Sequence, residues 1–127
     1  MPKEIIRTDK APGAVGPYSQ AIKVGNLLFL SGQVGLDPAT GKLAGDDMGT
    51  QLEQVIRNIT AVLEAAGSSL QQVVKATVFL YDMDDYAKMN EIYARHFGDN
   101  PTARSAVAVD RLPLGALVEI EVIALSE

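Results

Sequence analysis

The spacing of apolar residues divides the first third of the chain into short strands. Residues 4–8 fit a first strand, and a loop rich in Pro and Gly follows it. Gly25 and Asn26 then separate two apolar runs, 21–24 and 27–33, a pattern typical of a β-hairpin. The chain is therefore predicted to begin as a β-meander.

The middle of the chain shows helical and strand spacing in turn. Apolar residues recur at helical spacing over 50–66 and again over 84–97, and a glycine follows each segment, which predicts two amphipathic helices. The segment 73–81 between them is rich in β-branched and aromatic residues and is expected to form a strand.

Two apolar strands close the chain. They cover 103–109 and 117–125, are joined by a turn around Pro113, and are expected to pair as a hairpin. The predicted order of elements is therefore ββαβαββ, with residues 4–8 as an additional strand at the front.

The number of helices limits how much of the sheet this chain can cover. Two helices packed on one face of a mixed sheet give an α+β fold. The other face then keeps more apolar surface than a soluble monomer usually exposes. We expect that face to be buried between copies of the chain in a closed symmetric oligomer.

Charged residues interrupt both final strands. Arg104 lies in the first, and Glu119 and Glu121 lie in the second, among apolar neighbours on both faces. Strands that are apolar on both faces are packed against other structure on both sides. We therefore expect Arg104 and one glutamate to be buried together on the same face of the sheet, near a subunit boundary. The alternative is a cross-strand salt bridge that only fixes the register.

The composition restricts the classes of function. The chain of 127 residues is long enough for one domain, residues 1–127, and without cysteine it has no disulfide, thiolate nucleophile or zinc–thiolate site. Residues 1–10 have no apolar core of signal-peptide length, and the longest uncharged run, 24–36, is too short to span a bilayer, which favours a cytoplasmic protein. The formal net charge is −5 and the basic residues are scattered, which disfavours nucleic acid as a partner.

Arg104 and a nearby glutamate favour hydrolysis of a small anionic substrate. A guanidinium matches a carboxylate bidentately, and a glutamate whose pKa is raised by burial can hold or deprotonate a water molecule. The single histidine, His96, falls near the end of the second helix, where a capping or surface role is expected. With one histidine and no cysteine, we expect no metal site.

Three further places in the chain each allow two interpretations. Ser31 and Gly32 lie in an apolar run, where the main chain either approaches a ligand or forms a β-bulge, and the bulge is favoured. Tyr18 lies in a loop and either lines a pocket or packs over an edge. Asn90 interrupts the apolar stripe of the second helix and faces a cleft or solvent, of which solvent is the default.

Eight short motifs are spread along the chain: Gly16-Pro17-Tyr18-Ser19-Gln20, Ser31-Gly32-Gln33, Asp37-Pro38, Ala65-Ala66-Gly67, Thr77-Val78-Phe79-Leu80, Ala103-Arg104-Ser105, Arg111-Leu112-Pro113 and Glu119-Ile120-Glu121. In this order and spacing, from about residue 5 to residue 125, they resemble the Rid family of reactive intermediate deaminases, also called the YjgF family. The subgroup that they resemble most is RidA, the 2-iminobutanoate/2-iminopropanoate deaminases.

The resemblance implies a chorismate-mutase-like fold assembled as a homotrimer, with one active-site cleft at each subunit interface. It implies that Arg104 binds the substrate carboxylate and that Glu119 orients or activates the attacking water. Further cleft positions are implied for the main chain of Gly32 and Ala106 and for the side chains of Tyr18, Ser31 and Asn90.

The implied reaction is hydrolysis of an enamine or imine, the unstable product of pyridoxal-phosphate dehydratases, to a 2-oxo acid and ammonia. No cofactor or metal is expected, because the imine is already an electrophile. Three features depart from the family pattern. Ala106 stands where many members carry Cys, Gly35 replaces a frequent proline, and the connection from Phe97 to Pro101 is short, which can reshape the pocket rim and alter the preferred imine.

Other classes of function remain as alternatives. A non-catalytic binder or sensor of small 2-oxo or imino acids would use the same carboxylate clamp without turnover. A ribonuclease or translation inhibitor, an activity attached to relatives, is disfavoured by the acidic charge and the lack of a catalytic histidine motif. A chaperone that uses exposed apolar surface is disfavoured by a sealed trimer.

Overall fold

A computed structural model describes residues 2–126 and places strands before, between and after two helices. The strands are β1 (Glu4–Ile6), β2 (Ala21–Val24), β3 (Leu27–Leu30), β4 (Gln33–Val34), β5 (Leu36–Asp37), β6 (Lys42–Leu43), β7 (Val73–Leu80), β8 (Ala103–Ala108) and β9 (Val118–Leu125). The α-helices are α1 (Met48–Ala65) and α2 (Tyr86–Phe97), and short 3-10 helices lie at η1 (Leu70–Gln72), η2 (Met83–Asp85) and η3 (Pro113–Gly115). The short strands β4, β5 and β6 are additions to the predicted order.

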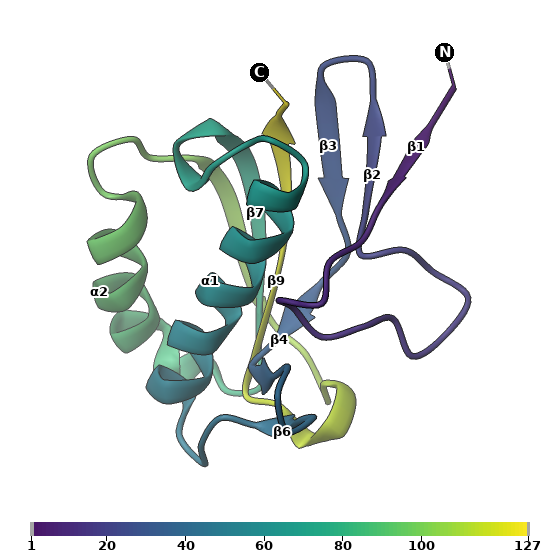
Figure 1. The fold of residues 1–127 in the computed structure, drawn as a ribbon. Helices are drawn as coiled ribbons and strands as arrows, with labels where there is room; N and C mark the ends of the chain where they lie inside the picture. Colours follow the sequence, from purple (N-terminus) through teal and green to yellow (C-terminus); the bar gives the residue numbers. More distant parts are fainter. Residues whose placement is uncertain (1, 127) are drawn as a thin grey trace.

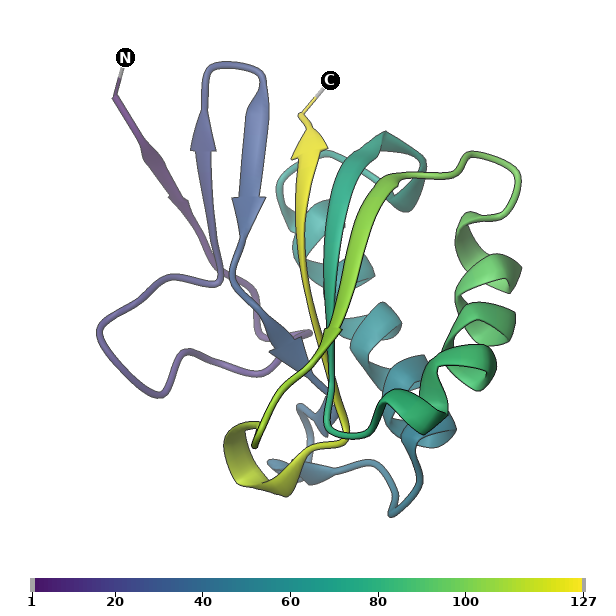
Figure 2. The same cartoon turned by 180° about the vertical axis from the view of Figure 1, so that it is seen from behind.

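Seven strands form one mixed sheet in the order β1-β2-β3-β9-β7-β8, with β4 also paired to β9. Strands β7 and β8 are parallel, and the other pairs of this sheet are antiparallel. Figure 1 shows α1 and α2 on one side of β7 and β9, while β1, β2 and β3 extend beyond the helices. Figure 2 shows the molecule from behind, and neither α-helix of the described chain lies over this face of the sheet. The predicted α+β arrangement is confirmed.

The helices are amphipathic and bury their apolar stripes against the sheet. Leu52, Val55 and Ile59 of α1 are fully buried in one core with Val78 and Ile120 of the sheet. Within residues 2–126, neither α-helix is long and apolar enough to span a bilayer.

Polar contacts fix where α1 begins and how it meets the small strands. Asp47 caps the helix by accepting the Thr50 N–H at 3.0 Å. The amide of Asn58 is fully buried and donates to the carbonyls of Val34, at 3.2 Å, and Leu36, at 2.9 Å. These bonds attach β4 and β5 to the helix.

The predicted pairing of the last two strands is wrong. Strand β8 pairs only with β7, in parallel, and β7 separates it from β9. The reason is the crossover through α2, which returns the chain to the end of the sheet where β7 began and so makes β8 parallel to β7. After β8 the chain crosses to the other side of β7 and there enters β9.

The expectation that Arg104 and a glutamate are buried together on the same face of the sheet is also wrong. Arg104 is aligned with Ala76, which is fully buried on the helix side of β7. Glu119 is aligned with Phe79 on β7 and with Val34 on β4, both on the face without helices. Because aligned residues share a face, Arg104 and Glu119 lie on opposite faces, and a salt bridge between them within one chain is excluded.

Candidate active site

Arg104 is held at the edge of the sheet by side chains of α2. Its Nη2 donates to Asn90 Oδ1 at 2.6 Å and to the Tyr86 hydroxyl at 3.1 Å, and its Nη1 lies 3.7 Å from the Met89 sulfur. The guanidinium carbon lies 4.8 Å from the ring centroid of Tyr93 and 5.7 Å from that of Tyr86. No salt bridge within residues 2–126 involves Arg104, so its charge is available to an anionic ligand.

The two tyrosines that flank Arg104 differ in polarity and exposure. Hydrogen bonds with Asn90 and Arg104, together with the arginine charge, lower the pKa of the Tyr86 hydroxyl, and this residue is 38% exposed. Burial raises the pKa of Tyr93, and its hydroxyl bonds to Thr102. Tyr86 is therefore the accessible and polarised hydroxyl beside the guanidinium.

A groove of about 520 Å³ leads away from Arg104 along the C-terminal half of α2. Asn90 lies with Arg104 in its lining, and Tyr93, Phe97 and Pro101 supply apolar surface. The rings of Tyr93 and Phe97 stack with their centroids 4.4 Å apart. The short connection after α2 forms part of the rim of this groove, next to the anionic-ligand anchor.

Glu119 lies on the face without helices, beside the break between β3 and β4. Burial is the main cause that raises the pKa of its carboxyl group, and the charge of Glu121 adds to it. The carboxylate packs over Gly32 so closely that a methyl group at Gly32 would overlap it. A half-buried carboxyl with a raised pKa is suited to accept a proton from water near neutral pH.

Ser31 and Gly32 form the β-bulge that the sequence favours. Phe29 is aligned with Ile123 and Gln33 with Ile120, so three residues on this strand oppose two on β9. The bulge turns the main chain of Gly32 toward Glu119. Whether the main chain there also meets a ligand stays a prediction.

Ser31, in the bulge, is bonded to the loop that carries Tyr18. The Ser31 hydroxyl donates to the Ser19 carbonyl at 2.6 Å, and the Ser31 N–H donates to the Gln20 carbonyl at 3.0 Å. Tyr18 is half exposed and lines a groove of about 540 Å³ between this loop and β1. The buried Gln20 amide fixes the loop by donating to the carbonyls of Thr8 and Pro12.

The remaining expected residues are distributed over the helix side. Ala106 lies near the middle of the edge strand β8, aligned with the buried Val78. His96 has a surface role, as expected, because its Nε2 lies 2.8 Å from Glu53 Oε1 between the two helices. No group of three or more potential metal-ligating residues is found in the described chain.

The candidate residues therefore form two separate groups. Arg104, Asn90 and Ala106 lie on the helix side at the edge of the sheet, and Glu119 lies with Ser31 and Gly32 near the bare face. The solvent default for Asn90 is wrong, because its amide binds Arg104. Tyr86 and Tyr93 were not predicted as site residues, although their spacing of four and three residues from Asn90 places all three on one side of α2.

Comparison with known proteins identifies relatives along nearly the whole chain. The model of a protein family described as Endoribonuclease L-PSP matches residues 8–126. A RutC family protein from Pyrococcus horikoshii is 56% identical over 98% of this chain and 99% of its own length. Reactive Intermediate Deaminase A, chloroplastic, of Arabidopsis thaliana is 50% identical over 96% of this chain and 65% of its own. The human 2-iminobutanoate/2-iminopropanoate deaminase is 43% identical over 97% and 90%.

Solved structures share this fold. RidA from an Antarctic Psychrobacter species superposes with a TM-score of 0.93 at 50% identity, covering 96% of this chain and 98% of its own. The structure of E. coli TdcF with bound serine has a TM-score of 0.92 at 40% identity, with the same coverage of both chains.

Proposed function

The chain belongs to the Rid (YjgF) family, and from this premise we propose that it hydrolyses reactive enamine and imine intermediates, such as 2-iminobutanoate and 2-iminopropanoate, to 2-oxo acids and ammonia. The family includes proteins named as deaminases of such compounds. The observation that carries the proposal is the guanidinium of Arg104, which is partly buried, fixed by α2 and without a salt bridge in the described chain.

Arg104 would bind the carboxylate of the imino acid through its guanidinium. The apolar groove beside it offers room for a small aliphatic side chain. The relative TdcF was solved with bound serine, which supports a site in this family for small molecules that carry a carboxylate.

Glu119 would activate the water. A water molecule adds to C2 of the protonated imine while Glu119 takes its proton, which gives a carbinolamine. Glu119 then returns the proton to nitrogen and accepts the proton of the carbinolamine hydroxyl as the C–N bond breaks, which forms the carbonyl of the 2-oxo acid and releases ammonia. Ammonia takes this proton from Glu119 and leaves as ammonium, which restores the carboxylate. The raised pKa of Glu119 supports this role, because the same group must accept and return one proton.

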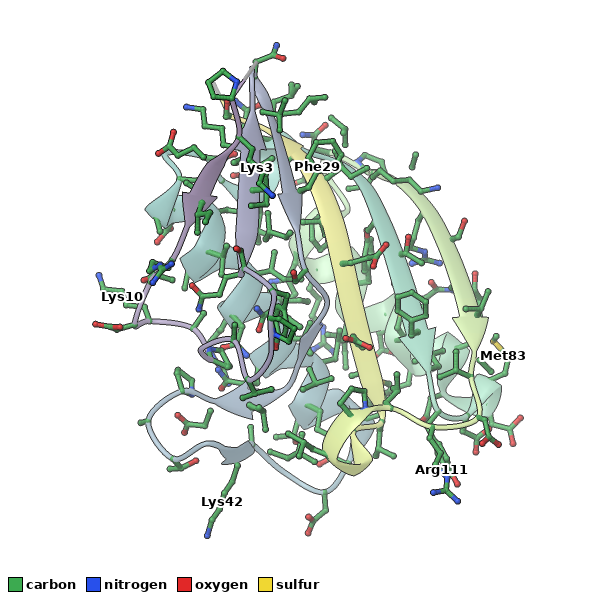
Figure 3. The ribbon with its side chains drawn as sticks, turned by 90° about the vertical axis from the view of Figure 1, so that its right-hand side faces the viewer. Lys3, Lys10, Phe29, Lys42, Met83 and Arg111 are labelled. Carbon is green, nitrogen blue, oxygen red and sulfur yellow. The ribbon has the colours of Figure 1, made fainter. Side chains whose placement is uncertain are left out.

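The reaction requires a second copy of the chain. Arg104 and Glu119 lie on opposite faces of the sheet, so one chain cannot place both against a substrate of a few atoms. The apolar face without helices, which includes Phe29 and Val107, each 42% exposed, supports burial between copies. Figure 3 shows Phe29 on this face. We therefore propose a homotrimer with a cleft at each interface, in which one subunit supplies Arg104 and the next supplies Glu119.

The other expected residues complete the proposed cleft. The main chain of Gly32 and Ala106 would bind the substrate, and Asn90 would orient Arg104. Tyr18 and Ser31 would line the wall on the Glu119 side. We place the protein in the cytoplasm on its composition, although the Arabidopsis relative carries the word chloroplastic in its name.

The test is a coupled assay. A dehydratase generates 2-iminobutanoate in the cuvette, and the release of 2-oxobutanoate is timed with the wild-type protein, with Arg104→Ala and with Arg95→Ala. Arg95 is an exposed arginine of α2 that pairs, within residues 2–126, with Glu53 and Glu91. We expect the wild type and Arg95→Ala to accelerate release, and Arg104→Ala to lose the acceleration. Equal acceleration by Arg104→Ala would refute the assignment.

A non-catalytic binder remains the second candidate, because the same Arg104 anchor would hold a 2-oxo acid without turnover. Binding of 2-oxobutanoate to the wild-type protein that depends on Arg104, with no acceleration over spontaneous hydrolysis, would favour it. That result would leave the fold and the anchor unchanged.

A further inference from the structure

The Tyr86 hydroxyl occupies a position on Arg104 that a bound carboxylate needs. Nη2 of Arg104 donates to two oxygens, Asn90 Oδ1 at 2.6 Å and Tyr86 Oη at 3.1 Å. A guanidinium nitrogen of this kind carries two hydrogens. Both hydrogens of Nη2 are therefore engaged in the ligand-free chain.

Nη2 takes part in both of the ways in which a guanidinium binds a carboxylate through two hydrogen bonds. The guanidinium binds a carboxylate bidentately along one of two edges, formed by Nε with Nη2 or by Nη1 with Nη2. Both edges include Nη2. A carboxylate that takes either edge of Arg104 must replace Asn90 or Tyr86 as the acceptor of one Nη2 hydrogen.

Of the two residues that accept from Nη2, Tyr86 is the one that a carboxylate can displace. Its bond to Nη2 is the longer of the two, and Tyr86 is exposed whereas Asn90 is half-buried. A tyrosine hydroxyl is a donor as well as an acceptor, so it can turn about its C–O bond and present its hydrogen. The carbonyl oxygen of Asn90 can only accept.

A carboxylate on the edge of a guanidinium still has unfilled lone pairs, since each of its two oxygens can accept about two hydrogen bonds. The oxygen that replaces Tyr86 on Nη2 lies beside the displaced hydroxyl. We propose that Tyr86 is a further ligand-binding residue, whose hydroxyl releases Nη2 when a carboxylate binds and donates its own hydrogen to that carboxylate. This inference rests on the proposed function for the position of the ligand at Arg104.

The first test is titration calorimetry with 2-oxobutanoate at fixed ionic strength. Tyr86→Phe keeps the ring beside Arg104 and removes only the hydroxyl. Tyr81→Phe removes another exposed tyrosine hydroxyl, on a separate groove, and serves as the matched control. We expect Kd to rise roughly tenfold in Tyr86→Phe, as for loss of a hydrogen bond to a charged group, and to stay unchanged in Tyr81→Phe. Equal or tighter binding by Tyr86→Phe overturns the inference, and so does a wild-type protein that does not bind.

A crystal structure of the wild-type protein with 2-oxobutanoate separates a direct contact from an effect through Arg104. We expect the Tyr86 hydroxyl within about 3.0 Å of a carboxylate oxygen. A carboxylate on Arg104 with the Tyr86 hydroxyl still bound to Nη2 overturns the inference.

The coupled imine assay distinguishes this inference from the proposed function. If Tyr86→Phe weakens 2-oxobutanoate binding but the wild-type protein does not accelerate hydrolysis, Tyr86 keeps its role and the hydrolase fails. If the wild type accelerates hydrolysis and Tyr86→Phe matches it in KM and kcat, the hydrolase stands and the role of Tyr86 is refuted.

Discussion

At the scale of single residues, Arg104 provides shape as well as charge. Its Nη2 meets two oxygens at once, and its plane lies near the ring of Tyr93, which a lysine ammonium on a flexible stem cannot reproduce. The sequence showed that this arginine was unusual, because it interrupts an apolar strand. The sequence did not show which side chains surround the guanidinium.

Arg104→Lys tests the contribution of shape while the charge is kept. We expect kcat/KM for 2-iminobutanoate to fall roughly 10-fold to 100-fold, because a charged hydrogen bond to the substrate is lost or misaligned. Arg95→Lys, on the exposed side of α2, is the control and should retain the wild-type rate. A fully active Arg104→Lys would mean that charge alone suffices.

In the proposed mechanism, Glu119 makes the rate fall toward low pH. Burial and Glu121 raise its pKa above the ordinary value of 4.5, and the carboxylate form is the one that accepts a proton from water. We expect kcat/KM to fall as the pH is lowered through this raised pKa, and Glu119→Gln to lose roughly 10²-fold to 10⁴-fold at neutral pH. A Glu119→Gln protein with the wild-type pH profile would remove Glu119 from the mechanism.

The same shift has a consequence for stability. A carboxyl whose pKa is higher in the folded than in the unfolded chain favours folding while it is protonated, below pH 4.5, and this advantage is lost as the pH rises through the folded pKa. Urea unfolding should therefore show Glu119→Gln to be more stable than the wild type at pH 7, with the difference reduced at pH 4. A constant difference at both values would contradict this.

The site was predictable in part. Arg104, Glu119 and Glu121 stood out because charges in apolar strands are rare, and only the family resemblance selected Glu119. Asn90 was visible as a polar residue in an apolar stripe, but the pattern alone favoured solvent for it. Tyr86 and Tyr93 were missed because tyrosine in a helix stripe is ordinary core material. Their polar role becomes visible only when β8 places Arg104 against α2.

At the scale of elements, the bulge between β3 and β4 places the main chain against Glu119, the proposed base. The extra residue turns Gly32 toward β9, and the absence of a side chain there leaves space for the Glu119 carboxylate. Glycine is thus needed at this position for the placement of a side chain on another strand.

Gly32→Ala tests this relation. The new methyl group would meet the flexible end of Glu119 and not its backbone, so the carboxylate should move while the fold is retained. We expect kcat to fall at least roughly tenfold, with a change in the free energy of unfolding within about 1 kcal/mol. Gly13→Ala, where a methyl group would meet no atom within 4 Å, is the matched control. Full activity of Gly32→Ala would separate the bulge from the chemistry.

The elements themselves were largely predictable, and their pairing was not. α1 was expected over 50–66 and spans Met48–Ala65, beginning earlier because Asp47 caps it. The hairpin β2–β3 was also predicted, because its turn residues, Gly25 and Asn26, lie directly between the two apolar runs and form a local signal. The final strands were paired wrongly because insertion of β9 between β3 and β7 depends on the whole sheet, and no local signal in either strand records it.

At the scale of the whole molecule, the acidic charge bears on the description of the family model as an endoribonuclease. The formal net charge is −5, and the single histidine is bound to Glu53 between the helices, away from Arg104. Neither feature favours cleavage of a polyanion, which generally requires a basic surface. The small-carboxylate site that we propose at Arg104 agrees better with the relatives named as deaminases.

The separation of Arg104 and Glu119 onto opposite faces makes subunit complementation the sharpest test of the proposed assembly. Arg104→Ala and Glu119→Gln should each be inactive alone as trimers. If the two variants are unfolded together and refolded in equal amounts, roughly one quarter of the clefts should combine an intact Arg104 with an intact Glu119 from the neighbouring subunit, by random assortment in a cyclic trimer. Activity should rise accordingly, and light scattering should give a mass of about three chains for the mixture and for each variant. Mixed trimers without recovered activity would mean that each cleft takes both groups from one chain, which the two faces of this sheet oppose.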